Sequence, residues 1–169
     1  DRGENIGGMR TVDGLLRDYP DRICYERGPN QKTRTWNALA TGVRLCLDYW
    51  RYLEPRYEHS PSLKARAAAQ VPRFAVRLAA APILGTRPAI RVLTGLARAV
   101  ECAVPPAADV VRFLEERRPD VIVITPLLYF GSSQVDYVRA ARDLGIPSIL
   151  CVGSWDHLTT KGLIHDVPD

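Results

Sequence analysis

Two short apolar runs near the end of the chain predict buried β-strands. Val121 to Ile124 (VIVI) and Ser148 to Val152 (SILCV) are continuous, and each is bounded by Pro or Gly, which is typical of strands covered on both faces of a sheet. Ser132 or Ser133 can cap a helix between them, and Gly145 stands where a left-handed C-terminal cap is favoured. Apolar residues recur at helical spacing in that helix, at Val135, Val138, Ala141 and Leu144. The pattern predicts a βαβ unit.

The predicted βαβ unit brings two segments of the chain together. A right-handed crossover places the carboxyl ends of both strands at one edge of a parallel sheet, so we expect Thr125 to Tyr129 and Gly153 to Lys161 to lie side by side. Open α/β sheets bind their ligands along that edge. The loop GSWDHLTTKG, residues 153–162, is therefore the leading candidate for a functional site.

A long region before the βαβ unit has helical periodicity. From Thr33 to about Tyr57 the apolar spacing predicts one long amphipathic helix, in which we expect Trp36 and Trp50 to anchor the core or an interface. Ser60-Pro61 predicts the start of another helix. Later prolines divide the next part of the chain into short helices, the last of which runs from about Pro88 to Cys102. A further helix is expected after Pro105-Pro106, before the first strand.

Composition and cysteine content are those of an ordinary globular protein. The chain has 169 residues, of which 46% are hydrophobic and 25% charged, enough for one domain with a real core. The longest apolar run, Leu78 to Leu84, is far too short to cross a bilayer. We expect a cytoplasmic protein that could also lie at the periphery of the inner membrane. The cysteines form no CxxC pair, which favours reduced, buried thiols over disulfides. They are Cys24, Cys46, Cys102 and Cys151.

Basic residues are concentrated in one segment. The formal net charge is +4, and from His59 to Val100 there is no Asp or Glu. Seven basic residues fall there, at Lys64, Arg66, Arg73, Arg77, Arg87, Arg91 and Arg98. The segment is either a solvated positive face or a surface that contacts an anionic membrane or an anionic acceptor. Nucleic acid is disfavoured as a partner, because no recognised nucleic-acid-binding module accompanies the charge.

The loop after the second strand offers several groups with useful chemistry. Ser154, Thr159 and Thr160 carry hydroxyls, and Lys161 is a point charge suited to phosphate or carboxylate. An ionised Asp156 beside His157 would raise the pKa of the imidazole and orient it, so the two form a candidate acid/base pair.

A purely structural explanation accounts for several of the same residues. Ser154 or Asp156 could cap the next helix, with Trp155 packed on the sheet edge. A metal site built from Asp156, His157, His165 and Asp166 is disfavoured, because the sequence lacks a tight ligand spacing such as HxH or HExxH. GxGxxG and GxxxxGKS are absent as well, which disfavours a dinucleotide oxidoreductase and a P-loop NTPase. We therefore expect neither a metal nor a cofactor.

The same segment resembles a known family. RRPDVIVITP, the helix after it, LGIPSILCVGSWDHLTTKGLI and the final PD resemble the N-terminal half of bacterial GT-B-type glycosyltransferase-like proteins. This superfamily includes UDP-GlcNAc 2-epimerase and the CDP-glycerol glycerophosphotransferases, and in it the loop reads SWDNLTTKG or close to it, so His157 stands where Asn is expected. The resemblance covers about residues 117–169. The opening DRGENIGGMRTVDGL also resembles a loop of such a domain, the one after its second strand.

The resemblance implies an α/β fold, a Rossmann-like parallel sheet that forms an incomplete GT-B N-terminal half with a large α-helical insertion. The chain would be a single partial domain over residues 1–169, with the helical insertion at 33–104 and an αβαβ core at 105–169. Because the chain begins without Met and stops soon after a strand and a loop, we expect a fragment that lacks the C-terminal nucleotide-binding domain.

The implied function is transfer of a sugar from a nucleotide-sugar donor to an acceptor in bacterial surface carbohydrate biosynthesis. This chain would be the acceptor-side half, and Asp156 or His157 would be the general base of an inverting reaction. The acceptor would be a carbohydrate or a lipid-linked carbohydrate, and residues 59–100 could contact the membrane surface. The implied substrate-binding residues are Thr125, Tyr129, Ser154, Trp155, Thr159, Thr160 and Lys161. Two alternatives stay open: a 2-epimerase or glycerophosphotransferase on the same fold, and a non-catalytic Rossmann-like binding module.

Overall fold

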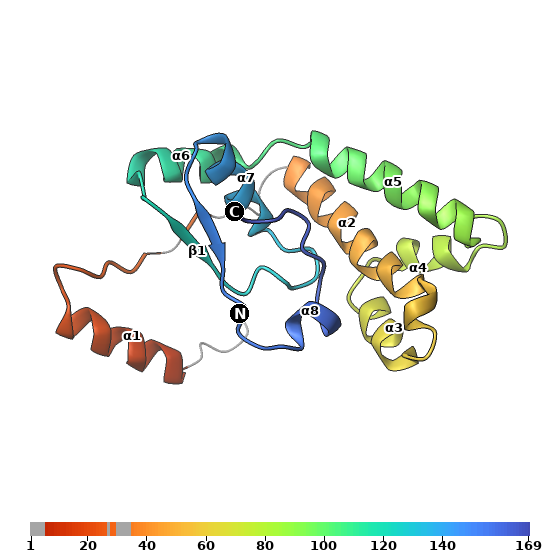
Figure 1. The fold of residues 1–169 in the computed structure, drawn as a ribbon, viewed down its shortest axis with the longest axis horizontal. Helices are drawn as coiled ribbons and strands as arrows, with labels where there is room; N and C mark the ends of the chain where they lie inside the picture. The colour runs from red at the N-terminus through yellow and green to blue at the C-terminus, as the bar shows by residue number, and fades with distance from the viewer. Residues whose placement is uncertain (1–5, 27, 30–34) are drawn as a thin grey trace.

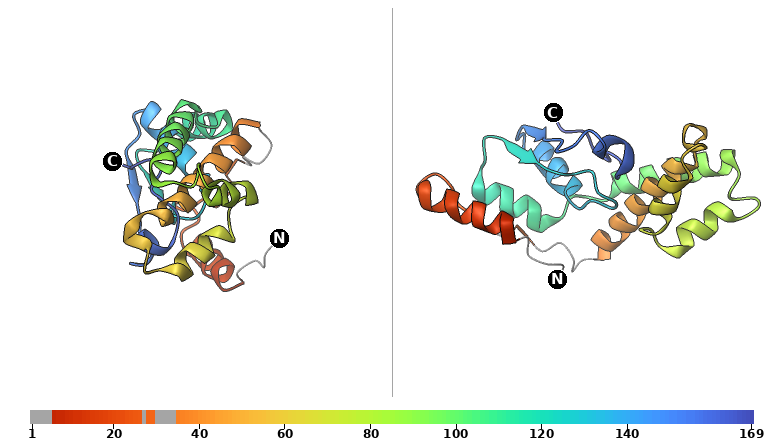
Figure 2. Two further views of the ribbon diagram at one scale, coloured as in Figure 1. Left: turned by 90° about the vertical axis from the view of Figure 1, so that its right-hand side faces the viewer. Right: turned by 90° about the horizontal axis from the view of Figure 1, so that it is seen from below.

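A computed structural model describes residues 6–26, 28–29 and 35–169 of the chain. Figures 1 and 2 show an elongated molecule in which helices α2 to α5 pack together at one end, while the two strands lie beside α6 and α7. Helix α1 lies at the opposite end. In chain order the elements are α1 (Ile6–Asp18), α2 (Thr35–Trp50), the 3-10 turns η2 (Arg51–Leu53) and η3 (Pro55–Tyr57), α3 (Pro61–Ala68), α4 (Arg73–Ala80), α5 (Arg87–Ala103), α6 (Ala108–Arg117), β1 (Ile122–Ile124), α7 (Val135–Asp143), β2 (Ser148–Leu150) and α8 (His157–Thr160).

The expected βαβ unit is present, but its sheet is small. β1 and β2 pair in parallel, with Ile122 opposite Ser148, and Gly145 ends α7 with φ +68° as predicted. One face of the sheet is covered, because Ile124 packs with Leu127 and with side chains of α7. Val123 and Ile149 on the other face are exposed. The expectation of strands buried on both faces is therefore wrong, since the described helices cover one face only.

A Rossmann-like fold class is overturned by the structure. The described chain is mostly helical, and its sheet has two strands. The segment expected to be an insertion builds a core of its own, because the apolar stripes of α2 to α5 face one another and not a sheet. That core contains Cys46, Tyr49, Trp50, Tyr52, Ala67, Val71, Ala75 and Ile90.

The helices follow the predicted apolar spacing with different limits. α2 ends at Trp50, short of Tyr57, and the chain continues in the turns η2 and η3, because Pro55 cannot supply a helical N–H. Pro61 and Pro88 lie in the first turns of α3 and α5, where proline is favoured. Trp50 is buried, whereas Trp36 is 62% exposed and anchors no core.

Other expectations are corrected at the two ends of the chain and at the caps. Residues 1–5 of the opening lie outside the described residues. The helix α1 begins at Ile6, where a loop is expected up to Arg10, and its second half is the helix that the spacing of Val12, Leu15 and Leu16 before Pro20 predicts. The N-cap position of α7 is Gln134 and neither Ser132 nor Ser133, although the Ser132 hydroxyl accepts a hydrogen bond from the Gln134 amide at 3.3 Å. Of the four thiols only Cys46 is buried, whereas the other three are exposed.

No helix in the described ranges combines the length and the apolarity that a membrane span requires.

Candidate functional site

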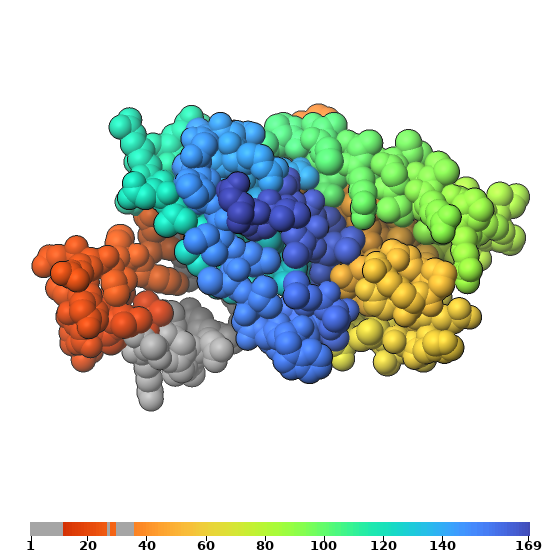
Figure 3. Space-filling model, in the orientation of Figure 1, coloured from red at the N-terminus to blue at the C-terminus, as the bar shows by residue number. Residues whose placement is uncertain are grey.

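The segments that follow β1 and β2 lie side by side, as the βαβ unit predicts. The Cys151 amide donates a hydrogen bond to the Ile124 carbonyl (3.0 Å), and the Gly162 amide donates one to the Leu128 carbonyl (2.7 Å). Residue 162 must be a glycine for this approach, because a Cβ there would lie 2.7 Å from the carbonyl oxygen of Tyr129. The loop at residues 153–162 is thus attached at both ends to the segment after β1. In Figure 3 the blue residues near the C-terminus lie on the viewed surface, beside the orange and yellow residues after α2.

Asp156 is at the centre of the hydrogen bonds inside this loop. The Ser154 hydroxyl donates to Oδ1 of Asp156, and the Thr160 hydroxyl donates to Oδ2 at 3.1 Å. The Thr159 hydroxyl donates to the backbone carbonyl of Asp156 at 3.1 Å. The hydrogen bond from Ser154 is the main reason that the pKa of Asp156 lies below its usual value, and the bond from Thr160 adds to it. Asp156 is therefore ionised at neutral pH.

His157 does not form the expected pair with Asp156. Although the structure describes both residues, no hydrogen bond joins their side chains, and Nδ1 of His157 is buried without a partner among the described residues. Both Asp156 oxygens are already bonded to hydroxyls. The acid/base pair therefore stays a prediction.

The remaining predicted site residues differ in their exposure to solvent, and so in their access to a ligand. Trp155 is 86% exposed, so its suggested packing on the sheet edge is wrong. Tyr129 is also exposed, and so is Thr125, whose carbonyl accepts a hydrogen bond from Nε2 of Gln134 at 3.2 Å. Lys161 is partly buried.

The end of helix α8 is held by two residues that follow α2. Nη2 of Arg51 donates to the Lys161 carbonyl at 2.5 Å, and the Tyr52 hydroxyl donates to the same carbonyl at 3.1 Å. Nη2 of Arg51 and the Tyr52 hydroxyl are also within hydrogen-bond distance of the Thr159 carbonyl, at 3.4 and 3.3 Å. A cation at the carbonyl end of a helix is electrostatically favourable. The position of the candidate loop is therefore coupled to the helical end of the molecule.

Sequence reasoning missed a buried network of charged side chains between the two parts of the fold. Arg44 on α2 is fully buried; its Nε donates to Oε1 of Glu101 on α5 at 3.0 Å, and its Nη2 donates to Oδ1 of Asp136 on α7 at 2.8 Å. Nη1 donates to the Ser132 carbonyl at 3.0 Å. One guanidinium thus joins three helices, and it is satisfied by hydrogen bonds that compensate its burial.

His165 completes this network from the C-terminal segment. Its side chain is 1% exposed, with Nε2 3.0 Å from Oδ1 of Asp48 and Nδ1 3.2 Å from Oε2 of Glu101. Burial by itself lowers the pKa of His165, but the hydrogen bonds and charges of the two carboxylates outweigh that effect and raise it above the usual value. Because each ring nitrogen faces a carboxylate, the site favours the protonated imidazole.

One sequence signal could have revealed this network. Arg44 and Asp48 are four residues apart, within the apolar part of the α2 pattern next to Leu47. Glu101 follows Ala97 by four residues and so lies on the buried stripe of α5. Charged residues on an apolar stripe indicate buried ion pairs, since an unpaired charge there would be costly.

Two of the four residues weighed as a metal site, His165 and Asp166, are engaged with other side chains. His165 binds Asp48 and Glu101, and Asp166 forms ion pairs with Arg139 (2.9 Å) and Arg142 (2.6 Å). Within the described ranges, no three His, Cys, Asp or Glu side chains are grouped so that they could hold a metal ion.

No family model matches the chain, and searches of the curated proteins and of the solved structures give no match. The resemblance to GT-B-type proteins that the loop SWDHLTTKG suggests therefore stays a prediction.

Proposed function

We propose that the loop at residues 153–162 contacts the acceptor of a glycosyltransferase-like enzyme, with Trp155 as the side chain that stacks on a sugar ring. The observation that carries this proposal is that Trp155 is 86% exposed and adjacent to an ionised Asp156. An indole exposed to water does not gain the favourable free energy that burial of an aromatic side chain provides. The CH face of a sugar supplies an apolar surface for it, while the sugar hydroxyls suit a neighbouring carboxylate.

The chemistry that this arrangement supports is sugar transfer to a hydroxyl. The acceptor oxygen forms the bond to the anomeric carbon, its proton passes to a base, and the nucleoside diphosphate leaves with the electron pair of the broken bond. Asp156 is charged and lies in the loop, so it can accept a hydrogen bond from the attacking hydroxyl. Because its pKa is lowered, it is a weak base, and its larger contribution is to orient that hydroxyl.

A second candidate function is a non-catalytic binding module. Its supporting observation is that both carboxylate oxygens of Asp156 are bonded within the loop, to Ser154 and Thr160. In that case Asp156 stabilises the turn into α8 and meets no substrate. The epimerase and glycerophosphotransferase alternatives have no residue in the described site that favours them.

The test uses the full-length protein with UDP-, GDP-, dTDP- and CDP-sugars and a panel of carbohydrate acceptors, with transfer followed by label incorporation. We expect one donor to support transfer, Trp155→Ala to raise the KM for the acceptor by about tenfold or more at an unchanged Tm, and Asp156→Asn to lower kcat. Trp36→Ala is the matched control, because Trp36 is also exposed but lies outside the loop. The enzyme proposal fails if no donor supports transfer or if Trp155→Ala behaves like Trp36→Ala. A wild-type protein that binds an acceptor without transfer, together with an Asp156→Asn variant altered only in Tm, would favour the second candidate.

A further inference from the structure

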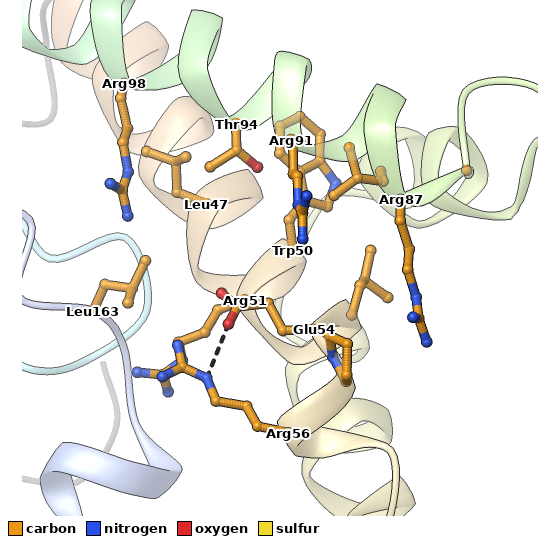
Figure 4. A pocket seen from close by; sticks show the side chains of 14 residues that line it. Leu47, Trp50, Arg51, Glu54, Arg56, Arg87, Arg91, Thr94, Arg98 and Leu163 are labelled. Carbon is orange, nitrogen blue, oxygen red and sulfur yellow. Dashed lines mark ion pairs between the residues drawn. The ribbon is translucent and has the colours of Figure 1, made fainter.

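A pocket of about 340 Å³ lies between α5 and the turns that follow α2. Figure 4 shows Arg87, Arg91 and Arg98 of α5 on one side of the pocket, with Arg51 and Arg56 of the turns on the other side. The charged residues that line it are Arg51, Glu54, Arg56, Arg87, Arg91 and Arg98. Apolar wall is supplied by Leu47, Trp50, Leu53, Ile90 and Leu163. The volume is within the range of small-molecule sites, roughly 300 to 1,000 Å³.

The positive charge of this pocket is mostly uncompensated. Glu54 pairs with Arg56, at 2.9 Å between Oε2 and Nε. No acidic side chain of the described residues forms an ion pair with Arg87, Arg91 or Arg98. Arg87 and Arg91 are four residues apart, and Arg91 and Arg98 are seven apart. The three guanidinium groups therefore lie on one face of α5 and repel one another. A face that concentrates like charges at a cavity is stabilised when an anion binds.

Arg51 extends the charge into the interior. It is 8% exposed, and its guanidinium lies 4.6 Å from the Tyr52 ring centroid while Nη2 donates to the Lys161 carbonyl. Its Nε has no hydrogen-bond partner among the described residues. A buried polar group without a partner is uncommon in native structures, and a bound ion or water is one explanation for it.

We propose that this pocket binds the phosphate groups of a phosphorylated ligand, a diphosphate being the best-fitting class. Guanidinium groups match pairs of phosphate oxygens, and such charge-assisted bonds are about twice as strong as neutral ones. The N-terminus of α5, which no described side chain caps, adds its positive end to the field of Arg87. The apolar wall accommodates the organic group to which the phosphate is attached. This inference does not depend on the proposed function of the loop.

The first experiment is calorimetric titration of the full-length protein with inorganic pyrophosphate at low and at high salt. We expect saturable binding that the charge reversal Arg91→Glu weakens by about tenfold or more, because several charge-assisted bonds are lost. Arg112→Glu is the matched control, since Arg112 is exposed on α6 outside the pocket and changes the net charge equally. Its affinity should stay within about twofold of wild type, and both variants should keep the wild-type Tm, because neither arginine is buried. The absence of binding, or equal weakening in both variants, would overturn the proposal.

A second experiment distinguishes a soluble phosphate ligand from a phospholipid headgroup. Phosphatidylcholine vesicles with and without phosphatidylglycerol are tested by flotation, in the presence and absence of pyrophosphate. Vesicle binding that pyrophosphate displaces and that Arg91→Glu abolishes places a lipid headgroup in the pocket. Pyrophosphate binding without vesicle binding supports a soluble ligand. Vesicle binding that ignores pyrophosphate and falls equally in both variants contradicts the pocket. Because the readout is binding, failure of sugar transfer leaves this result intact.

Discussion

His165 and Asp48 are 117 residues apart in the sequence, yet Nε2 of one lies 3.0 Å from Oδ1 of the other inside the protein. Asp48 also accepts hydrogen bonds from the Gly131 amide (2.8 Å) and the Leu163 amide (2.6 Å). A single carboxylate on α2 therefore holds the loop after β1 and the segment that follows the candidate site. The position of the loop at residues 153–162 depends on this buried anchor.

Removal of this carboxylate should destabilise the protein strongly. Asp48→Ala leaves two amides and Nε2 of His165 without an acceptor, and we expect a loss of about 3 to 5 kcal/mol in the free energy of unfolding. Urea denaturation of the variant measures it, with Asp120→Ala at an exposed position as the control. A difference between the two variants of less than about 1 kcal/mol would contradict the anchoring role.

The raised pKa of His165 predicts a pH dependence of stability. A group whose pKa is higher in the folded state contributes its full stabilisation below the unfolded pKa, here 6.5, and loses it as pH rises through the folded value. The free energy of unfolding should therefore decrease as pH rises above 6.5, and His165→Gln should remove this component. Denaturation curves at a series of pH values test it, with the exposed His59 replaced by Gln as the control. Equal slopes in wild type and His165→Gln would show that His165 does not carry the effect.

Two glycines with similar backbone angles should respond differently to alanine. Gly145 has φ +68°, and a methyl group added there would meet no atom within 4 Å, so Gly145→Ala should cost about 1 to 2 kcal/mol from backbone strain alone. Gly131 has φ +65°, and its Cβ would lie 2.9 Å from Cγ of Leu45. Gly131→Ala should therefore cost roughly 1 to 3 kcal/mol more, because packing is added to strain. The measurement is the urea midpoint of each of the two variants, relative to wild type. Equal shifts of the two midpoints would show that Leu45 moves aside at no cost.

The four thiols should divide into one protected and three reactive groups. Burial raises the pKa of the Cys46 thiol to about 11, so only about one in a thousand is thiolate at pH 8. Cys24, Cys102 and Cys151 are exposed. Brief iodoacetamide treatment followed by peptide mapping should label these three and spare Cys46 until denaturant is added. Early labelling of Cys46 would show that the core around α2 opens readily.

Local patterns in the sequence predict local structure well. The apolar runs before Thr125 and before Gly153 form the expected parallel strands, and the three-and-four spacing after Thr33 forms α2. Gly145 takes the left-handed cap that the pattern indicates. The adjacency of the two loops follows as well, because a right-handed crossover leaves one arrangement for the strand ends.

The spacing of apolar residues along a helix does not specify which element the apolar face packs against. The spacing on α2 and α5 is compatible with packing on a sheet or on other helices, and the Rossmann-like expectation is wrong because these helices pack on one another. The same limit applies to Trp155. Its position in the chain could not distinguish packing on the sheet edge from exposure, since no sequence neighbour decides whether a surface is covered.

By itself, the sequence determined where strands, helices and turns form and which loop follows each strand, because these depend on residues within a few positions of one another. Only the tertiary structure decided which charges are buried together. Arg44 and Asp48 of α2 lie far from Glu101 and His165 in the sequence, and these charges are tolerated in the interior because they supply one another's hydrogen bonds there. The same physical reason applies to the arginine pocket, whose charges come from two helical segments that meet only after folding.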